Sequence, residues 1–176
     1  MKTITIIIIL FIINSLNNNA YSQTDLSKYK SMFTVNFIRY VGWSEDATTG
    51  NFVIGVLKNE KVASKLKILT KDKKFGYQKI VVKEFNNINE ITDCQVLFIS
   101  KYINFSNKNS LIIKQKLNNK NTLIITNSEG AIKKGSMINF VIRNNKLMFE
   151  ISTSNATLFN LKISSSLTAL SNAIIK

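Results

Sequence analysis

Few residues of this 176-residue chain could carry chemistry, because it has no histidine and a single cysteine, Cys94. Histidine is the usual general base of enzymes and a frequent zinc ligand, and one thiolate cannot build a thiolate metal site. A carboxylate pair could still cleave a glycosidic bond, but the spacing of the carboxylates places no two of them across a cleft. The carboxylates considered are Glu84, Glu90, Asp93, Glu129 and Glu150. The sequence therefore predicts no enzyme, no cofactor and no metal site.

Six polar residues directly follow or end three short apolar runs, and they are the candidate ligand loops. Ligands of open α/β sheets sit beyond the carboxyl ends of the strands, where such residues gather. Loops are also polar by default, so each residue has an ordinary interpretation as well. The six candidates are Lys58, Asn59, Ser100, Lys101, Asn127 and Ser128.

The elements that position these loops are strands that alternate with helical segments. Continuous apolar runs predict strands buried on both faces, and apolar residues at three- and four-residue steps predict helices. The predicted strands are residues 52–57, 79–85, 94–100 and 122–126; the predicted helices are 62–69 and 110–117, with a single turn inside 86–93. This alternation predicts a mainly parallel sheet with helices on both faces.

An antiparallel hairpin breaks the alternation in the second half of the chain. Two apolar runs, residues 137–142 and 146–151, flank Asn144 and Asn145, which tolerate the left-handed backbone of a tight turn. Asn139 is polar within the first run, so if buried it must hydrogen-bond, and we expect it to tie the hairpin to a neighbouring loop. With residues 154–160 and 161–175 predicted helical, the fold class is α/β: a single three-layer domain with a mixed, mainly parallel sheet.

A helix is predicted at the start of the domain, capped by Thr24 or Asp25 and ended by Gly42. Its apolar residues fall on one stripe that is rich in aromatic side chains. Such a stripe packs against a core in most proteins, and it can also dock a partner. The stripe consists of Leu26, Tyr29, Phe33, Phe37, Tyr40 and Val41.

The first 22 residues have the pattern of a secretory signal peptide: an early Lys2, an apolar run from Ile4 to Ile13 and small residues before Gln23. Those ten run residues rise only about 15 Å as a helix, too short for a hydrocarbon core of about 30 Å. We expect cleavage after Ser22, which leaves 176 − 22 = 154 residues, the size of one domain. The predicted division is signal peptide 1–22 and domain 23–176, exported and not membrane-spanning.

The net charge of the whole chain is +14, and removal of Lys2 with the signal leaves 23 − 10 = +13. Such a charge suits nucleic acid or an anionic surface, yet only Arg39 and Arg143 are arginines, the residue type that best reads bases and phosphates. We therefore expect no nucleic-acid partner. Cys94 has no partner cysteine in the chain, so it is expected to pack as a small apolar residue; an intermolecular disulfide is the alternative.

Five blocks in order resemble the YfiR family, also called DUF4154. Residues 30–43 resemble its opening pattern K-x-x-F-x-x-N-F-x-x-F/Y-V-x-W, and residues 52–57, 93–100, 135–141 and 149–151 with 161–167 are similar to its later blocks. Ser44 stands where the family commonly has proline. Disulfides hold the domain in some members of the family; Cys94 stands where such a cysteine lies, but this chain has no second cysteine.

The resemblance implies an exported, non-enzymatic regulator that controls a membrane-bound signalling protein, of the diguanylate cyclase or histidine kinase type, by periplasmic contact. It also implies that the domain can form a homodimer. The competing hypothesis is a periplasmic sensor module that binds a small ligand through the strand-end loops. The candidate partner or dimer surface is Tyr29, Phe33, Asn36, Trp43, Lys162, Ser164 and Ser165.

Overall fold

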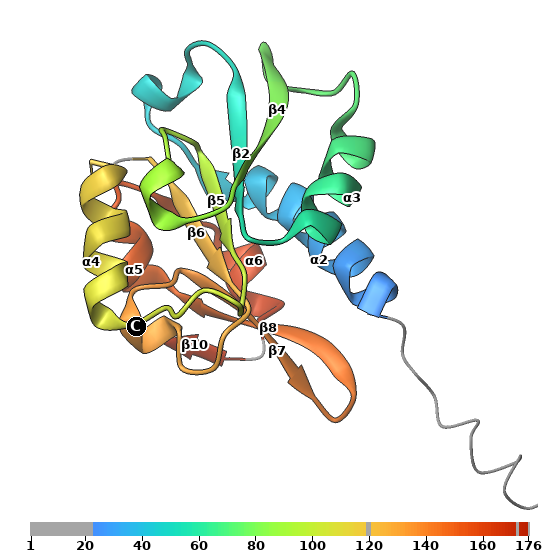
Figure 1. The fold of residues 1–176 in the computed structure, drawn as a ribbon. Coiled ribbons are helices and arrows are strands. Elements are labelled where there is room, and N and C mark those ends of the chain that lie inside the picture. The colour runs from blue at the N-terminus through green and yellow to red at the C-terminus, as the bar shows by residue number, and fades with distance from the viewer. Residues whose placement is uncertain (1–22, 119–120, 172, 176) are drawn as a thin grey trace, which may run out of the picture.

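The computed structural model describes residues 23–118, 121–171 and 173–175, so the predicted signal peptide lies outside the described residues. Its centre is an eight-stranded sheet with the order β10-β8-β7-β6-β5-β2-β4-β3, and β1 pairs with β9 in a separate small sheet (Figure 1). Neighbours from β4 to β7 are parallel, whereas β7 and β8 are antiparallel. This is the mixed, mainly parallel sheet that the sequence predicts.

The predicted strands are confirmed to within two residues at each end. β5 and β6 are buried at every position, as continuous apolar runs lead one to expect. The short β3, which pairs antiparallel with β4, was not predicted. The strands of the large sheet are β2 (Phe52–Leu57), β3 (Lys74–Phe75), β4 (Gln78–Phe85), β5 (Val96–Ile99), β6 (Leu123–Thr126), β7 (Ile138–Arg143), β8 (Lys146–Ser152) and β10 (Ala173–Ile175).

Helices cover both faces of the sheet. α2 (Gln23–Phe37) and α3 (Glu60–Thr70) lie on one side, and α4 (Asn107–Lys116) and α5 (Thr153–Thr157) on the other (Figure 1). Asn59 caps α3 and Ser106 caps α4, each through a side-chain oxygen that accepts a backbone N–H of the first turn. A single 3-10 turn, Ile88–Glu90, lies where one was predicted. The three-layer α/β class is confirmed.

The apolar stripe of α2 packs on the β7–β8 part of the sheet. The ring centroid of Phe37 lies 5.0 Å from that of Phe149 and 5.7 Å from that of Phe140. The prediction that this helix continues to Gly42 is wrong. After Phe37 comes a 3-10 turn (Ile38–Tyr40), and then β1 (Val41–Gly42) pairs with β9 (Lys162–Ile163), because that backbone finds hydrogen-bond partners in the C-terminal segment. Thr24 and Asp25, predicted as caps, lie within the helix.

The predicted hairpin is confirmed. Asn144 and Asn145 both have positive φ, 48° and 58°, and they join the paired residues Arg143 and Lys146 as a two-residue turn. β6 pairs with β7 only at the first two residues of β7, so the rest of the hairpin projects past the end of β6. Figure 1 shows it extending from the sheet. This projection forms one wall of the site described below.

The prediction of a helix over residues 161–175 is wrong. Only α6 (Ser165–Ala169) is helical there; β9 precedes it and β10 follows it. β10 adds a parallel strand beside Glu150–Ser152 of β8, an edge that the sequence does not reveal. Its two isoleucines are β-branched and favour extended backbone. The helix predicted at 154–160 is confirmed only as the shorter α5, and Asn160 adopts a left-handed conformation after it.

Candidate functional site

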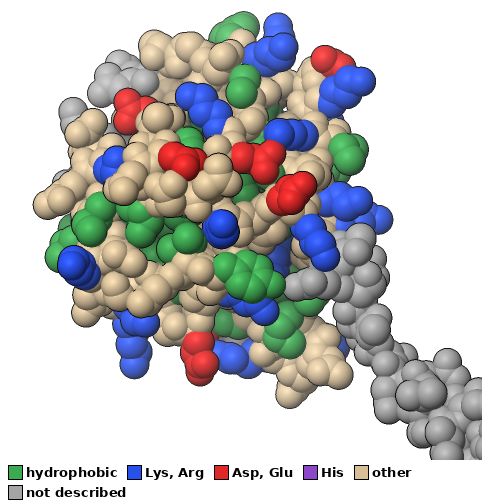
Figure 2. Space-filling view, in the orientation of Figure 1, with side chains coloured by type: hydrophobic (Ala, Val, Ile, Leu, Met, Phe, Trp, Pro, Cys, Tyr) green, Lys and Arg blue, Asp and Glu red, His purple; other side chains and the backbone are tan. Residues whose placement is uncertain are grey.

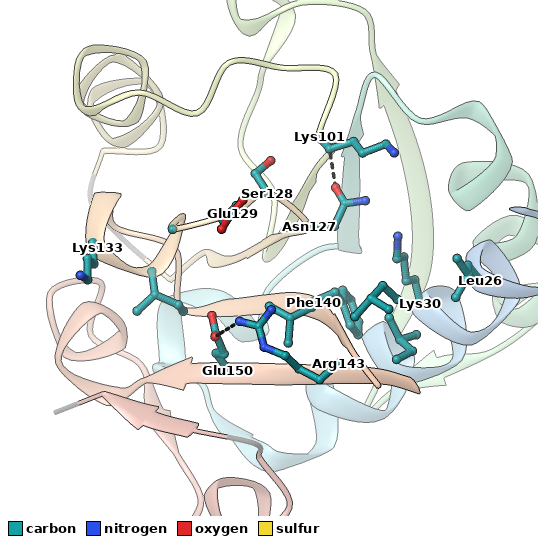
Figure 3. Close-up of a pocket in the computed structure, with 15 residues that line it drawn as sticks. Leu26, Lys30, Lys101, Asn127, Ser128, Glu129, Lys133, Phe140, Arg143 and Glu150 are labelled. Atoms are coloured by element: carbon teal, nitrogen blue, oxygen red, sulfur yellow. Dashed lines mark hydrogen bonds and ion pairs between the residues drawn. The ribbon is translucent and has the colours of Figure 1, made fainter. Parts of the chain in front are cut away.

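The carboxyl ends of β2, β5 and β6 lie at one edge of the sheet, next to the first turns of α2. A cleft of about 530 Å³ opens there between α2, the loop after β6 and the projecting hairpin (Figure 3). A second cleft of about 340 Å³ adjoins it at the start of α3. The two clefts share Leu26, Lys30, Lys101 and Asn127. We call them together the strand-end cleft.

The structure brings most of the predicted ligand loops together at this cleft. Those that line it are Lys58, Asn59, Lys101, Asn127 and Ser128. Ser100 does not line it, because its side chain is fully buried and its Oγ accepts the N–H of Tyr102 at 3.3 Å. The Oδ1 of Asn59 is already engaged as the cap of α3. The ligand-binding role of these loops stays a prediction.

Lys30 is a member of the cleft that sequence reasoning missed. It lies one turn after Leu26 in α2, and Figure 3 shows its amine pointing toward that of Lys101. Burial and, less strongly, the charge of Lys101 lower the pKa of Lys30 from its ordinary value. Among the side chains that the structure describes, no carboxylate forms an ion pair with either lysine. Helical spacing alone does not tell which strand ends a helix crosses, so no sequence signal marked Lys30.

Side-chain hydrogen bonds hold the loops of the cleft in place. The Oδ1 of Asn127 accepts the N–H of Lys101 at 2.7 Å, which joins the loops after β5 and β6. The N–H of Ser128 donates to Oδ1 of Asn139 at 3.1 Å. Asn139 is fully buried, so the prediction that it ties the hairpin to a neighbouring loop is confirmed. The Oγ of Ser128 is buried without a partner among the described residues.

Three of the five carboxylates considered above, those of Glu84, Glu90 and Glu150, have structural partners. An oxygen of Glu150 lies 3.4 Å from Nη2 of Arg143 at the cleft, and Glu84 pairs with Lys67 on the surface. Glu90 accepts the N–H of Asn86 at 2.8 Å. No group of three or more His, Cys, Asp or Glu side chains within the described ranges is placed to hold a metal ion.

Cys94 is confirmed as a buried residue of the core. Gly55 makes room for it: a Cβ on Gly55 would lie 3.2 Å from the Cys94 Sγ and 2.7 Å from a ring carbon of Phe85. Burial raises the pKa of the Cys94 thiol to about 12. Because the thiolate is the reactive form, we predict that the native protein at pH 8 reacts only slowly with Ellman's reagent. In guanidinium chloride the single thiol should react at once. Fast reaction of the native protein, or a dimer on a non-reducing gel, would contradict this prediction.

A second concave surface, the apolar groove, lies between α2, β8 and α6 and has a volume of about 430 Å³. Leu170, 68% exposed, and Tyr40, 39% exposed, line it; Tyr29 and Met32 are further exposed apolar residues of α2. β10 pairs with β8 only from Glu150 onward, so the outer edge of β8 beside the groove has no neighbouring strand among the described residues. The groove is lined by Phe33, Asn36, Phe37, Arg39, Tyr40, Leu147, Met148, Phe149, Leu167 and Leu170.

The predicted partner surface coincides with the groove only in part. Phe33 and Asn36 line the groove, and Tyr29, 50% exposed, lies one helical turn before Phe33. Trp43 does not: its ring packs edge-on against Phe52 with centroids 5.2 Å apart, and its Nε1 donates to the carbonyl of Ile38. The role of this surface in binding stays a prediction.

The C-terminal part of that predicted surface lies beside the end of α2. The N–H of Ser164 donates to the carbonyl of Tyr40 at 2.9 Å, and Lys162 pairs with Gly42 between β9 and β1. The hydroxyl of Ser164 caps α6, and Ser165 is exposed at the first position of that helix. None of these three predicted residues lines the groove. Leu170 does, and its spacing of three from Leu167 was the signal that could have identified it.

These features define a small α/β domain with two concave surfaces suited to binding. The chain belongs to the YfiR/HmsC-like family (DUF4154), whose model matches residues 27–172. A comparison with curated proteins gives no match. Family membership implies a periplasmic, regulatory and non-catalytic protein of cyclic-di-GMP signalling. Within the described residues, none of the helices combines the length and the apolar character needed to cross a membrane.

Proposed function

We propose that the protein is exported, loses residues 1–22 and controls a membrane-bound signalling protein, of the diguanylate cyclase or histidine kinase type, through periplasmic contact. The observation that supports this most is the apolar groove, which exposes large apolar side chains beside an unpaired strand edge on a member of a periplasmic regulatory family. Exposed apolar patches of this kind are typical of protein interaction sites.

The charge of the chain indicates which partner the groove suits. Arg39 lines the groove, and the mature chain carries 23 − 10 = +13 charges. Figure 2 shows lysine and arginine side chains scattered over the visible face, with a few acidic ones among them. Copies of such a chain repel one another, whereas an apolar segment with acidic neighbours is attracted. We therefore assign the groove to an acidic periplasmic segment of the signalling protein, and a homodimer is the alternative outcome.

Leu170→Glu tests this assignment. A carboxylate at Leu170 would have to be buried against the partner and would repel its acidic residues. We expect at least tenfold less of the inner-membrane signalling protein to be recovered in a pull-down from envelope extracts. In a deletion strain, the variant should also fail to restore the cyclic-di-GMP level that the wild-type gene restores.

Leu158→Glu is the matched control, since Leu158 is 65% exposed at the end of α5, away from the groove. It should behave as wild type at equal protein level by immunoblot. Equal loss with both variants would contradict the assignment of the groove. Recovery of no signalling protein at all, with growth and surface attachment unchanged in the deletion strain, would contradict the proposed function itself.

The strand-end cleft supports a second function, that of a sensor module for a small ligand. Its volume is typical of small-molecule sites, and its loops are held by the hydrogen bonds of Asn127 and Asn139. A ligand at a hundred times its Kd adds about 2.7 kcal/mol of stability. A thermal-shift screen with a panel of metabolites therefore tests this function, and a flat response across the panel would count against it.

A further inference from the structure

The strand-end cleft holds positive charge that the described chain does not neutralise. The amine of Lys30 from α2 points toward that of Lys101 from the loop after β5 (Figure 3), and neither pairs with a carboxylate among the side chains that the structure describes. Glu129 and Glu150 line the same cleft, but Figure 3 places both on the side opposite Lys30. Arg143 is already paired with Glu150. Lys30 and Lys101 are the charged residues of the wall that the two clefts share, and Lys101 also lies over the ring of Tyr102, with its Nζ 5.6 Å from the ring centroid.

A neutral donor completes the set. The Oδ1 of Asn127 accepts the N–H of Lys101, and only an oxygen can accept there, so the orientation of the amide is settled. Its NH2 group consequently faces the space between the two lysines, as Figure 3 shows. Three nitrogen donors from three separate segments therefore converge on one place. The amide oxygen of Asn127 does not face that place, because it accepts the N–H of Lys101.

The charged form of Lys30 is in an unfavourable position without an anion. Burial and the neighbouring Lys101 both lower the pKa of Lys30, since each makes its charged form less favourable. An anion between the lysines would offset both effects and would accept hydrogen bonds from all three donors. We expect the anion at the wall that the two clefts share. Elsewhere it would be repelled by the carboxylates of Glu60 in the adjoining cleft and Glu129 in the larger one.

We propose that the strand-end cleft binds a small anionic molecule, through a phosphate or carboxylate group held by Lys30, Lys101 and the amide of Asn127. The inference rests on the second proposed function and names its ligand class. The volume of the larger cleft, about 530 Å³, leaves room for the remainder of such a molecule along the projecting hairpin.

Isothermal titration of the purified protein tests the proposal, with inorganic phosphate and succinate as separate probes and chloride at matched ionic strength as the reference. We expect saturable binding of at least one probe. Lys30→Met and Lys101→Met should each weaken it at least tenfold. Asn127→Asp, which keeps the oxygen that holds Lys101 but replaces the donor by a carboxylate, should abolish it. Lys30→Arg, which keeps the charge, should retain most of it.

Lys108→Met is the matched control, because Lys108 is an exposed lysine of α4 that lines neither cleft and carries the same charge. It should leave binding unchanged. Saturable binding of phosphate alone, or of succinate alone, would support the proposal and would identify the ligand group as a phosphate or a carboxylate. No saturable binding of either probe, or equal loss with Lys108→Met and Lys30→Met, would overturn it. These titrations need no partner protein, so their failure would leave the regulatory function untouched.

Discussion

Replacing Phe37 by alanine should lower the free energy of unfolding by about 3–5 kcal/mol, the usual cost of removing a buried phenylalanine. Phe37 is 1% exposed, and its ring contacts three others, those of Phe33, Phe140 and Phe149. These contacts attach α2 to the sheet. Chemical denaturation followed by circular dichroism measures the loss, and the melting temperature should fall by about 10 °C.

Tyr29→Ala on the same helix is the control for this prediction. Its side chain is 50% exposed and has no ring contact among those found within the described ranges, so we expect a loss below about 1 kcal/mol. Phe37→Leu keeps most of the buried apolar volume and should fall between the two. A similar loss for Phe37→Ala and Tyr29→Ala would show that α2 is not anchored through Phe37.

α2 connects the two surfaces proposed to bind. Lys30, in the middle of the helix, lines the strand-end cleft, and Phe33, three residues later, lines the apolar groove. A shift of this helix would change both surfaces at once, because Phe33 also contacts Phe140 and Phe149 of the hairpin. An anion bound at Lys30 and a partner in the groove are therefore expected to affect each other's affinity, and equally in both directions.

The central strands and the hairpin were predictable because their signals are local. A continuous apolar run such as Phe52–Leu57 favours a buried strand wherever it occurs, and two asparagines between apolar runs favour a tight turn. The C-terminal segment was not predictable, since β9 and β10 form only where β1 and the edge of β8 offer partners. The partner of β9 lies more than a hundred residues earlier in the chain, so the local spacing of residues does not reveal this pairing.

The residues of the candidate site were likewise predictable only where the sequence signal is local. Lys101 and Asn127 follow strands, and the parallel topology brings the ends of such strands together. Lys30 was missed because its position depends on how α2 crosses the sheet. Trp43 is predicted to lie on the partner surface, yet its indole packs against Phe52 and donates to a backbone carbonyl. The position of an aromatic residue after a helix does not indicate such contacts.

Asn139→Leu should lower the free energy of unfolding by about 2–4 kcal/mol, through buried hydrogen bonds that lose their acceptor. The Oδ1 of Asn139 accepts from the hydroxyl of Thr126 at 2.8 Å and from the N–H of Ser128 at 3.1 Å. The Thr126 hydroxyl has a second partner in Ser136, at 2.8 Å, but the Ser128 N–H does not gain one from a leucine. Thermal and chemical denaturation measure the loss, and hydrogen exchange of the Ser128 amide should accelerate.

A double-mutant cycle with Thr126→Val separates the hydrogen bonds from a general packing defect. If Asn139 and Thr126 act through their contact, the double variant should lose less stability than the sum of the single variants, by about 1 kcal/mol. Strictly additive losses would contradict that account. Because the loop freed at Ser128 also carries Asn127, Asn139→Leu should further weaken anion binding at Lys30 and Lys101, whereas a packing defect confined to the hairpin would leave that binding intact.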